Sequence, residues 1–131
     1  MPVDAALRRL VRQRADDRCE YCGLHQDELP FVTFHVEHII ARKHGGISDE
    51  SNCCLACHWC NLNKGSDIAT RVEGQLVPLF HPRTQTWAEH FSRQSDLIVG
   101  LTPIGRGTVR LLDMNDEDRR QIRTTHAADT V

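Results

Sequence analysis

Residues 34–46 read FHVEHIIARKHGG, an apolar run that carries two histidines and a glutamate before it ends in a basic segment and a glycine pair. Such a run, rich in β-branched residues, favours a short strand. Glu37 and His38 are adjacent, so on a regular strand their side chains would point to opposite faces. If both serve one site, the strand must end, bulge or twist there. The flanking sequence decides between such a site and a solvated strand face.

Two cysteine pairs with the same spacing flank this stretch, CEYC at residues 19–22 and CHWC at residues 57–60. Each pair can bring two sulfurs to one ion, and two pairs complete a tetrahedral zinc site. The alternative is a set of buried free thiols or a redox pair, which a single C-x-x-C motif would leave open. We therefore predict a structural zinc ion at the base of the loop that contains the strand, bound by Cys19, Cys22, Cys57 and Cys60. The adjacent Cys53 and Cys54 are interpreted as packing residues of a second strand.

In sequence order, the segments CEYC, HVEHII, GG, Asn52 and LACHWCNLNKG together resemble the HNH endonuclease family. The resemblance covers roughly residues 19–66 and is specific as a combination, although each fragment alone would be weak. It implies an α+β fold with a small ββα-metal core, in which a two-stranded antiparallel hairpin and a helix surround one divalent ion. The zinc site would clamp this core.

The resemblance also implies roles for four polar residues. Glu37 matches the acidic metal ligand, His38 the general base and Asn61 the second metal ligand. Asn52 matches the middle asparagine, which braces the loop and the base. Oxygen ligands suit Mg²⁺ or Mn²⁺, and Ni²⁺ or another transition metal is the alternative. Many relatives carry histidine at the position of Asn61, so asparagine is a known variant there.

Basic residues near the motif are candidates for contacts with phosphate groups. Lys64 lies one helical turn after Asn61, so we expect both on one side of the helix. Arg42 and Lys43 lie in the loop after the first strand, and we predict that they also bind the substrate. His35 shares the strand face of Glu37, where it is either an extra ligand or simply a half-exposed polar residue.

The rest of the chain is expected to form one domain with this core, because 131 residues allow a single modest core. Asp4 is the expected N-cap of an amphipathic first helix, whose arginines would face mainly solvent. The predicted segments are an N-terminal helix (1–18), the zinc-clamped core (19–66), a C-terminal α/β extension (67–125) and a disordered end (126–131). In the extension, we expect a short helix after Pro82, a strand at 96–101 and a helix start at Thr102 and Pro103.

The composition limits the partners. A formal net charge of −2 argues against strong non-specific binding to nucleic acid by bulk charge. Basic residues still gather locally, and local potential matters more than the total at a contact surface. No apolar run is long enough for a membrane span, and the N-terminus lacks the apolar segment of a signal peptide. We therefore expect a cytoplasmic protein without a membrane partner.

The first hypothesis is a metal-dependent HNH endonuclease that acts on double-stranded DNA. His38 would activate a water molecule, while Glu37 and Asn61 hold the divalent ion. One base and one ion cut one strand, so a monomer would nick and a double-strand cut would need a dimer; either oligomeric state is open. The alternative is a noncatalytic zinc-stabilised module that binds nucleic acid or protein. RNA is a third candidate, as the substrate of the same enzyme.

Overall fold

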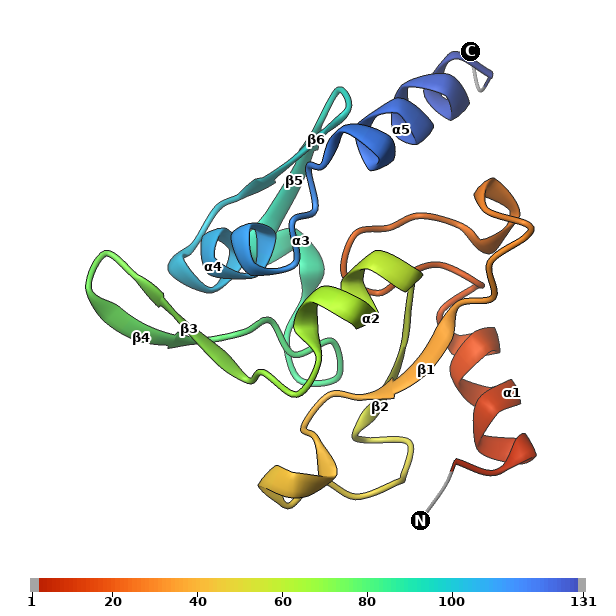
Figure 1. Ribbon diagram of the computed structural model, residues 1–131, viewed down its shortest axis with the longest axis vertical. Coiled ribbons are helices and arrows are strands. Elements are labelled where there is room, and N and C mark those ends of the chain that lie inside the picture. Colours follow the sequence, from red (N-terminus) through yellow and green to blue (C-terminus); the bar gives the residue numbers. More distant parts are fainter. Residues whose placement is uncertain (1–2, 130–131) are drawn as a thin grey trace.

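The chain is built from helices and short strands, and in the part that the structure describes the strands form three two-stranded hairpins (Figure 1). The structure, a computed structural model, describes the backbone of residues 3–129 and the side chains of residues 3–125. In chain order, its elements are α1 (Ala5–Arg14), η1 (Gln26–Glu28), β1 (His35–His38), η2 (Arg42–His44), β2 (Cys53–Ala56), α2 (His58–Lys64), β3 (Ala69–Val72), β4 (Gln75–Pro78), α3 (Trp87–His90), β5 (Phe91–Gln94), β6 (Leu97–Gly100), α4 (Pro103–Leu111) and α5 (Glu117–Asp129). Within the described chain, no helix has the length and apolar content needed to cross a bilayer.

The centre of the fold is the hairpin β1–β2 with helix α2. The strands are antiparallel, and their register places Glu37 opposite Cys54 and His38 opposite Cys53. All four residues of β2 are buried, which agrees with the interpretation of Cys53 and Cys54 as packing residues. Helix α2 begins directly after Cys57 and contacts both strands. This mixed arrangement of helices and antiparallel hairpins is consistent with the ββα-metal core that the sequence predicts.

Helix α1 begins where the sequence predicts, and its arginines are exposed as expected except for Arg12, which is half-buried. Asp4 caps the helix by accepting a hydrogen bond from a first-turn N–H at 2.8 Å. Arg12 donates a hydrogen bond to the carbonyl of Phe34 at 2.7 Å, and Arg14 donates one to the carbonyl of Cys53 at 2.8 Å. The two guanidinium groups therefore join α1 to the segments where β1 and β2 begin.

The extension combines expected and unexpected elements. Strand β6 lies within the predicted strand at 96–101, and helix α3 follows Pro82 after a turn. Thr102 caps α4 by accepting a hydrogen bond from the N–H of Gly105 at 3.1 Å. The sequence prediction contained neither the hairpin β3–β4 nor strand β5.

Helix α5 ends the described part of the chain. It extends to Asp129 and so overlaps residues 126–129 of the segment for which disorder is expected. Glu117 and Asp118 occupy the first turn of this helix, where negative charge favours the helix dipole. Residues 130 and 131 lie outside the described residues.

The extension shares its hydrophobic core with the ββα segment. One cluster of buried side chains includes the cysteines of both knuckles together with Phe80, Phe91 and Leu112 of the extension. A hydrogen bond also joins the two segments: the indole N–H of Trp87 donates to the carbonyl of Tyr21 at 2.8 Å. The core segment and the extension therefore pack together through one continuous hydrophobic core.

Candidate active site and metal centre

A cavity of about 390 Å³ lies between the end of β1 and helix α2. Its lining includes Glu37 and His38 from the strand and Asn61 from the helix. Arg42 and His35 also line it. Glu37 and His38, which are adjacent in the sequence, therefore meet Asn61, which lies more than twenty positions later, in one open space.

The two adjacent residues Glu37 and His38 lie at the end of β1. Strand β1 ends at His38, and the next residue, Ile39, donates its backbone N–H to the carbonyl of Asn52 at 2.8 Å. The side chain of Glu37 is only 8% exposed, whereas His38 is half-buried. The expectation that the strand must end, bulge or twist at this point is thus met by termination.

His38 is held by the loop that returns to β2. Its Nε2 atom forms a hydrogen bond with the hydroxyl of Ser48 at 2.8 Å. Burial lowers the pKa of His38, and the nearby positive charge of Arg42 lowers it further. A lowered pKa keeps the imidazole neutral at neutral pH, the state in which it can accept a proton.

Asn52 supports the same loop from behind the cavity. Its Oδ1 atom accepts a hydrogen bond from the N–H of Ile40 at 2.9 Å. Its Nδ2 atom donates hydrogen bonds to the carbonyls of Ile40 and Ile47, each at 2.9 Å. Turning this amide towards the cavity would break all three bonds, so the geometry favours a bracing role.

Glu37 carries a carboxylate in an unfavourable place for a negative charge. Burial raises its pKa to about 7, although Lys64, Tyr21 and Cys54 each oppose the increase. Lys64 acts through its charge, whereas Tyr21 and Cys54 act through hydrogen bonds to the carboxylate. A second cation in the cavity would stabilise the ionised form further.

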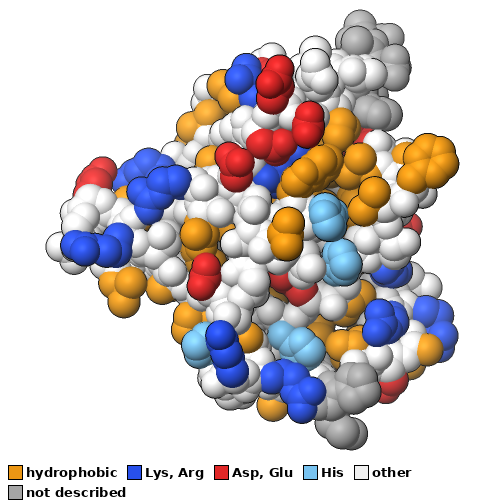
Figure 2. Space-filling view, viewed as in Figure 1, with side chains coloured by type: hydrophobic (Ala, Val, Ile, Leu, Met, Phe, Trp, Pro, Cys, Tyr) orange, Lys and Arg blue, Asp and Glu red, His pale blue; other side chains and the backbone are white. Residues whose placement is uncertain are grey.

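Lys64 is placed differently from the prediction that it contacts phosphate. Its side chain is 1% exposed, and its Nζ atom donates a hydrogen bond to the carbonyl of Ile39 at 2.9 Å. Buried in this way, Lys64 offers its charge to Glu37 rather than to a ligand in solvent. Arg42 and Lys43, by contrast, are exposed on η2. Figure 2 shows basic and histidine side chains close together over this lower part of the molecule.

Asn61 occupies the first turn of α2. The helix is capped by Cys57, whose sulfur accepts a hydrogen bond from the N–H of Cys60 at 3.4 Å. The cysteine knuckle therefore fixes the position of Asn61. Among the residues that the structure describes, no hydrogen bond engages the Asn61 side chain, which leaves its amide oxygen available to the cavity.

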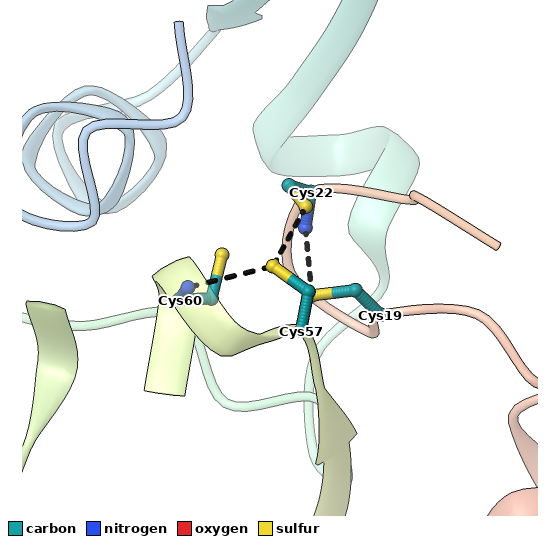
Figure 3. Close-up of side chains that lie close together, drawn as sticks. All are labelled: Cys19, Cys22, Cys57 and Cys60. Carbon is teal, nitrogen blue, oxygen red and sulfur yellow. Dashed lines mark hydrogen bonds between the residues drawn. The ribbon is translucent and has the colours of Figure 1, made fainter. Parts of the chain in front are cut away.

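The four cysteines of the two knuckles form a separate, buried cluster (Figure 3). Their sulfur atoms all lie within 4.8 Å of one another, and the pair from Cys22 and Cys57 is 3.6 Å apart. Sulfurs about 2.3 Å from a tetrahedral zinc ion are separated by about 3.8 Å. The donor set and its size therefore fit a metal ion such as zinc, whereas Cys53 and Cys54 lie outside the cluster.

The electrostatics of this cluster favour a bound cation. Burial raises the pKa of Cys19 and Cys60 well above the ordinary value, because an isolated buried thiolate is unfavourable. Hydrogen bonds with the other cysteines, chiefly Cys19, lower the pKa of Cys22. Four deprotonated sulfurs would need a compensating ion at this position.

One residue near this cluster was missed by the sequence analysis. Arg119 of α5 donates a hydrogen bond to the sulfur of Cys60 at 3.1 Å. Burial alone would lower the pKa of Arg119, but the sulfurs of Cys60 and Cys22 raise it. The sequence offered no local signal for this contact, because the two residues are 59 positions apart.

No curated protein and no solved structure matches the chain significantly. The family comparison, however, covers the segment that contains both the cavity residues and the four cysteines. Residues 19–67, the ββα core of this chain, match the HNH endonuclease family.

Proposed function

We propose that the protein is a metal-dependent endonuclease that hydrolyses phosphodiester bonds in DNA. The observation that carries this proposal is the convergence of Glu37, His38 and Asn61 on one cavity within the segment that matches the HNH family. A basic group, two oxygen ligands and access from solvent are what metal-assisted hydrolysis requires.

In the proposed reaction, His38 accepts a proton from a water molecule through its neutral imidazole. The hydrogen bond to Ser48 holds the ring in position. The water oxygen forms a bond to phosphorus while the bond from phosphorus to the 3′ oxygen breaks. The products are a 5′ phosphate and a 3′ hydroxyl, and the leaving oxygen takes its proton from solvent.

Glu37 and Asn61 would hold the divalent ion, for which Mg²⁺ or Mn²⁺ is the first choice and Ni²⁺ the alternative. The fit rests on a buried carboxylate with a raised pKa and on an amide without a protein partner among the described residues. Such an ion supplies Lewis-acid stabilisation of charge on the phosphate and on the leaving oxygen. Lys64, which is buried, balances part of the charge of Glu37.

Double-stranded DNA is the proposed substrate. Arg42 lines the cavity and Lys43 follows it on the exposed η2 helix, so both can contact the phosphate backbone. With one base per chain, each encounter would cut one strand, whereas a dimer would be needed for paired cuts. The six unpaired cysteines suit the reducing cytoplasm that the sequence led us to expect. In the four-cysteine cluster we propose a structural zinc ion.

Plasmid nicking tests the proposal directly. Supercoiled DNA is incubated with the protein with and without Mg²⁺ or Mn²⁺, and conversion to the open circle is measured. His38→Ala should reduce the rate at least ~100-fold, the usual contribution of a general base. His44→Ala is the matched control, because His44 is exposed and outside the cavity lining. The melting temperature and the zinc content of both variants should equal those of wild type.

The rival function, a noncatalytic module that binds nucleic acid or protein, predicts a different result. Wild type would then retain the plasmid in a binding assay without nicking it under any metal. Cleavage of a labelled RNA but not of the plasmid would instead assign RNA as the substrate. Equal nicking by wild type and His38→Ala would remove His38 from the proposed mechanism.

A further inference from the structure

Helix α5 of the extension places a buried arginine against the four-cysteine cluster. Arg119 is 0% exposed, and its Nη1 atom donates a hydrogen bond to the sulfur of Cys60 at 3.1 Å. Its other donors bond to the carbonyls of Leu112 and Asp113 and to the carboxylate of Asp116. Its guanidinium carbon lies 5.6 Å from the ring centre of Trp59, the residue next to Cys60.

A second arginine follows one helical turn later and is buried in the same way. Arg123 is 2% exposed, donates a hydrogen bond to the carbonyl of Met114 at 2.6 Å and interacts electrostatically with Cys22. Among the described residues, its Nε atom is buried without a hydrogen-bond partner. No carboxylate of the described chain forms a salt bridge with it.

Two buried guanidinium groups need more negative charge than the carboxylates supply. Asp116 pairs with Arg119, but carbonyl groups are the main partners of Arg123. Burying an uncompensated charge is strongly unfavourable. A divalent ion with four thiolate ligands carries two excess negative charges, so the metal-bound cluster supplies the compensation that the arginines need.

We propose that Arg119 is a positioning residue of the metal site, which places positive charge beside the thiolates and, together with the buried Arg123 one turn later, holds the C-terminal extension against them. This inference rests on the proposed role of the four cysteines as a metal site. Because linkage is reciprocal, metal binding then strengthens the docking of α5, and docking of α5 strengthens metal binding. The extension is therefore part of the metal centre rather than a separate appendage.

Cobalt titration measures the effect on the metal. Co²⁺ bound by thiolates has a characteristic absorption spectrum, so its affinity for the full-length protein can be measured in competition with a chelator. Arg119→Met should lower the affinity by about 10- to 100-fold, the usual cost of removing an outer partner of a metal ligand. Arg119→Lys keeps a charge and should recover part of the loss. Arg120→Met, at an exposed neighbour bonded to Asp96, should change the affinity less than about threefold.

Hydrogen exchange measures the effect on the extension. At full metal occupancy, the amides of residues 117–125 should exchange at least ~10-fold faster in Arg119→Met than in wild type, while β1 and β2 stay protected. This comparison remains informative even if the metal-free protein unfolds, because every sample contains bound metal.

The outcomes separate this inference from the function on which it rests. If wild type binds neither Co²⁺ nor Zn²⁺, the proposed metal site itself is wrong. If wild type binds and Arg119→Met binds equally well, the inference is overturned. Equal losses in Arg119→Met and Arg119→Lys would assign Arg119 to packing alone and would also overturn it.

Discussion

We predict that the protein becomes more stable when the buried carboxylate of Glu37 is replaced by a neutral group. Glu37→Gln keeps the shape of the side chain and removes its charge. Burial raises the pKa of Glu37 from 4.5 to about 7, although Lys64 and Tyr21 favour the ionised form. At about 1.4 kcal/mol per pKa unit, ionised Glu37 lowers the free energy of unfolding by about 3 kcal/mol.

The pH dependence follows from the direction of this shift. Because the pKa is higher in the folded than in the unfolded state, the protonated carboxyl favours folding. That contribution is complete below pH 4.5 and is lost as the pH rises through about 7. The glutamine variant keeps it at all pH values. Its advantage over wild type should be about 2 kcal/mol at pH 6 and about 3 kcal/mol at pH 8.5.

Urea unfolding provides the assay, with one equivalent of zinc and without Mg²⁺ or Mn²⁺. With a slope of about 2 kcal/mol per molar urea, the midpoint of Glu37→Gln should rise by about 1.5 M at pH 8.5. Glu50→Gln, at an exposed carboxylate of the neighbouring loop, should stay within about 0.5 kcal/mol of wild type. Adding Mn²⁺ should then stabilise wild type more than the variant, because only wild type keeps the carboxylate ligand. A neutral or destabilising Glu37→Gln at pH 8.5 would refute the reasoning.

The parts of the site that could be predicted from the sequence are those whose geometry depends only on residues close together in the chain. The spacing of Cys57, Cys60 and Asn61 belongs to one knuckle and one helix start, so local geometry fixes their relation. The N-cap at Asp4 was predictable for the same reason. The requirement that two neighbouring side chains reach one cavity predicted that the strand ends, bulges or twists at this point, and β1 ends at His38.

Lys64 shows where local spacing stops being sufficient. Helical periodicity gives its direction relative to Asn61 but does not show which side of the helix another segment covers. In the structure Lys64 lines a pocket of about 120 Å³ with Leu79 and Phe80, residues of the extension. Its burial therefore depends on packing between segments that are distant in the sequence.

Arg119 and Arg123 illustrate the same limit more strongly. The segment NDEDRRQIR, residues 115–123, has acidic residues followed by arginines, a pattern typical of a solvated helix. Which arginines are buried is decided by sulfur and carbonyl partners, such as Cys60, that the local pattern cannot identify. Arg120 lies between them and remains exposed.

Two further predictions test the loop and the helix that form the cavity. A Cβ atom at Gly46 would lie 1.7 Å from the carbonyl oxygen of Ile40 and 2.8 Å from Nδ2 of Asn52, so Gly46→Ala should lower the free energy of unfolding by about 3 kcal/mol and reduce nicking. Gly45→Ala should cost only about 1–2 kcal/mol, because its Cβ meets no neighbour and only the positive φ of 92° is unfavourable. If urea unfolding showed Gly45→Ala to be less stable than Gly46→Ala, this description of the loop would be contradicted. Asn61→Ala should abolish nicking with every metal, because the only neutral oxygen ligand is removed while the thiolates are untouched. Asn61→His should retain activity and shift the preference from Mg²⁺ towards Ni²⁺ or Co²⁺, since imidazole nitrogen favours these ions. Plasmid nicking across a metal series measures both variants, and wild-type activity of Asn61→Ala with Mg²⁺ would show that Asn61 does not bind the ion and only shapes the start of α2.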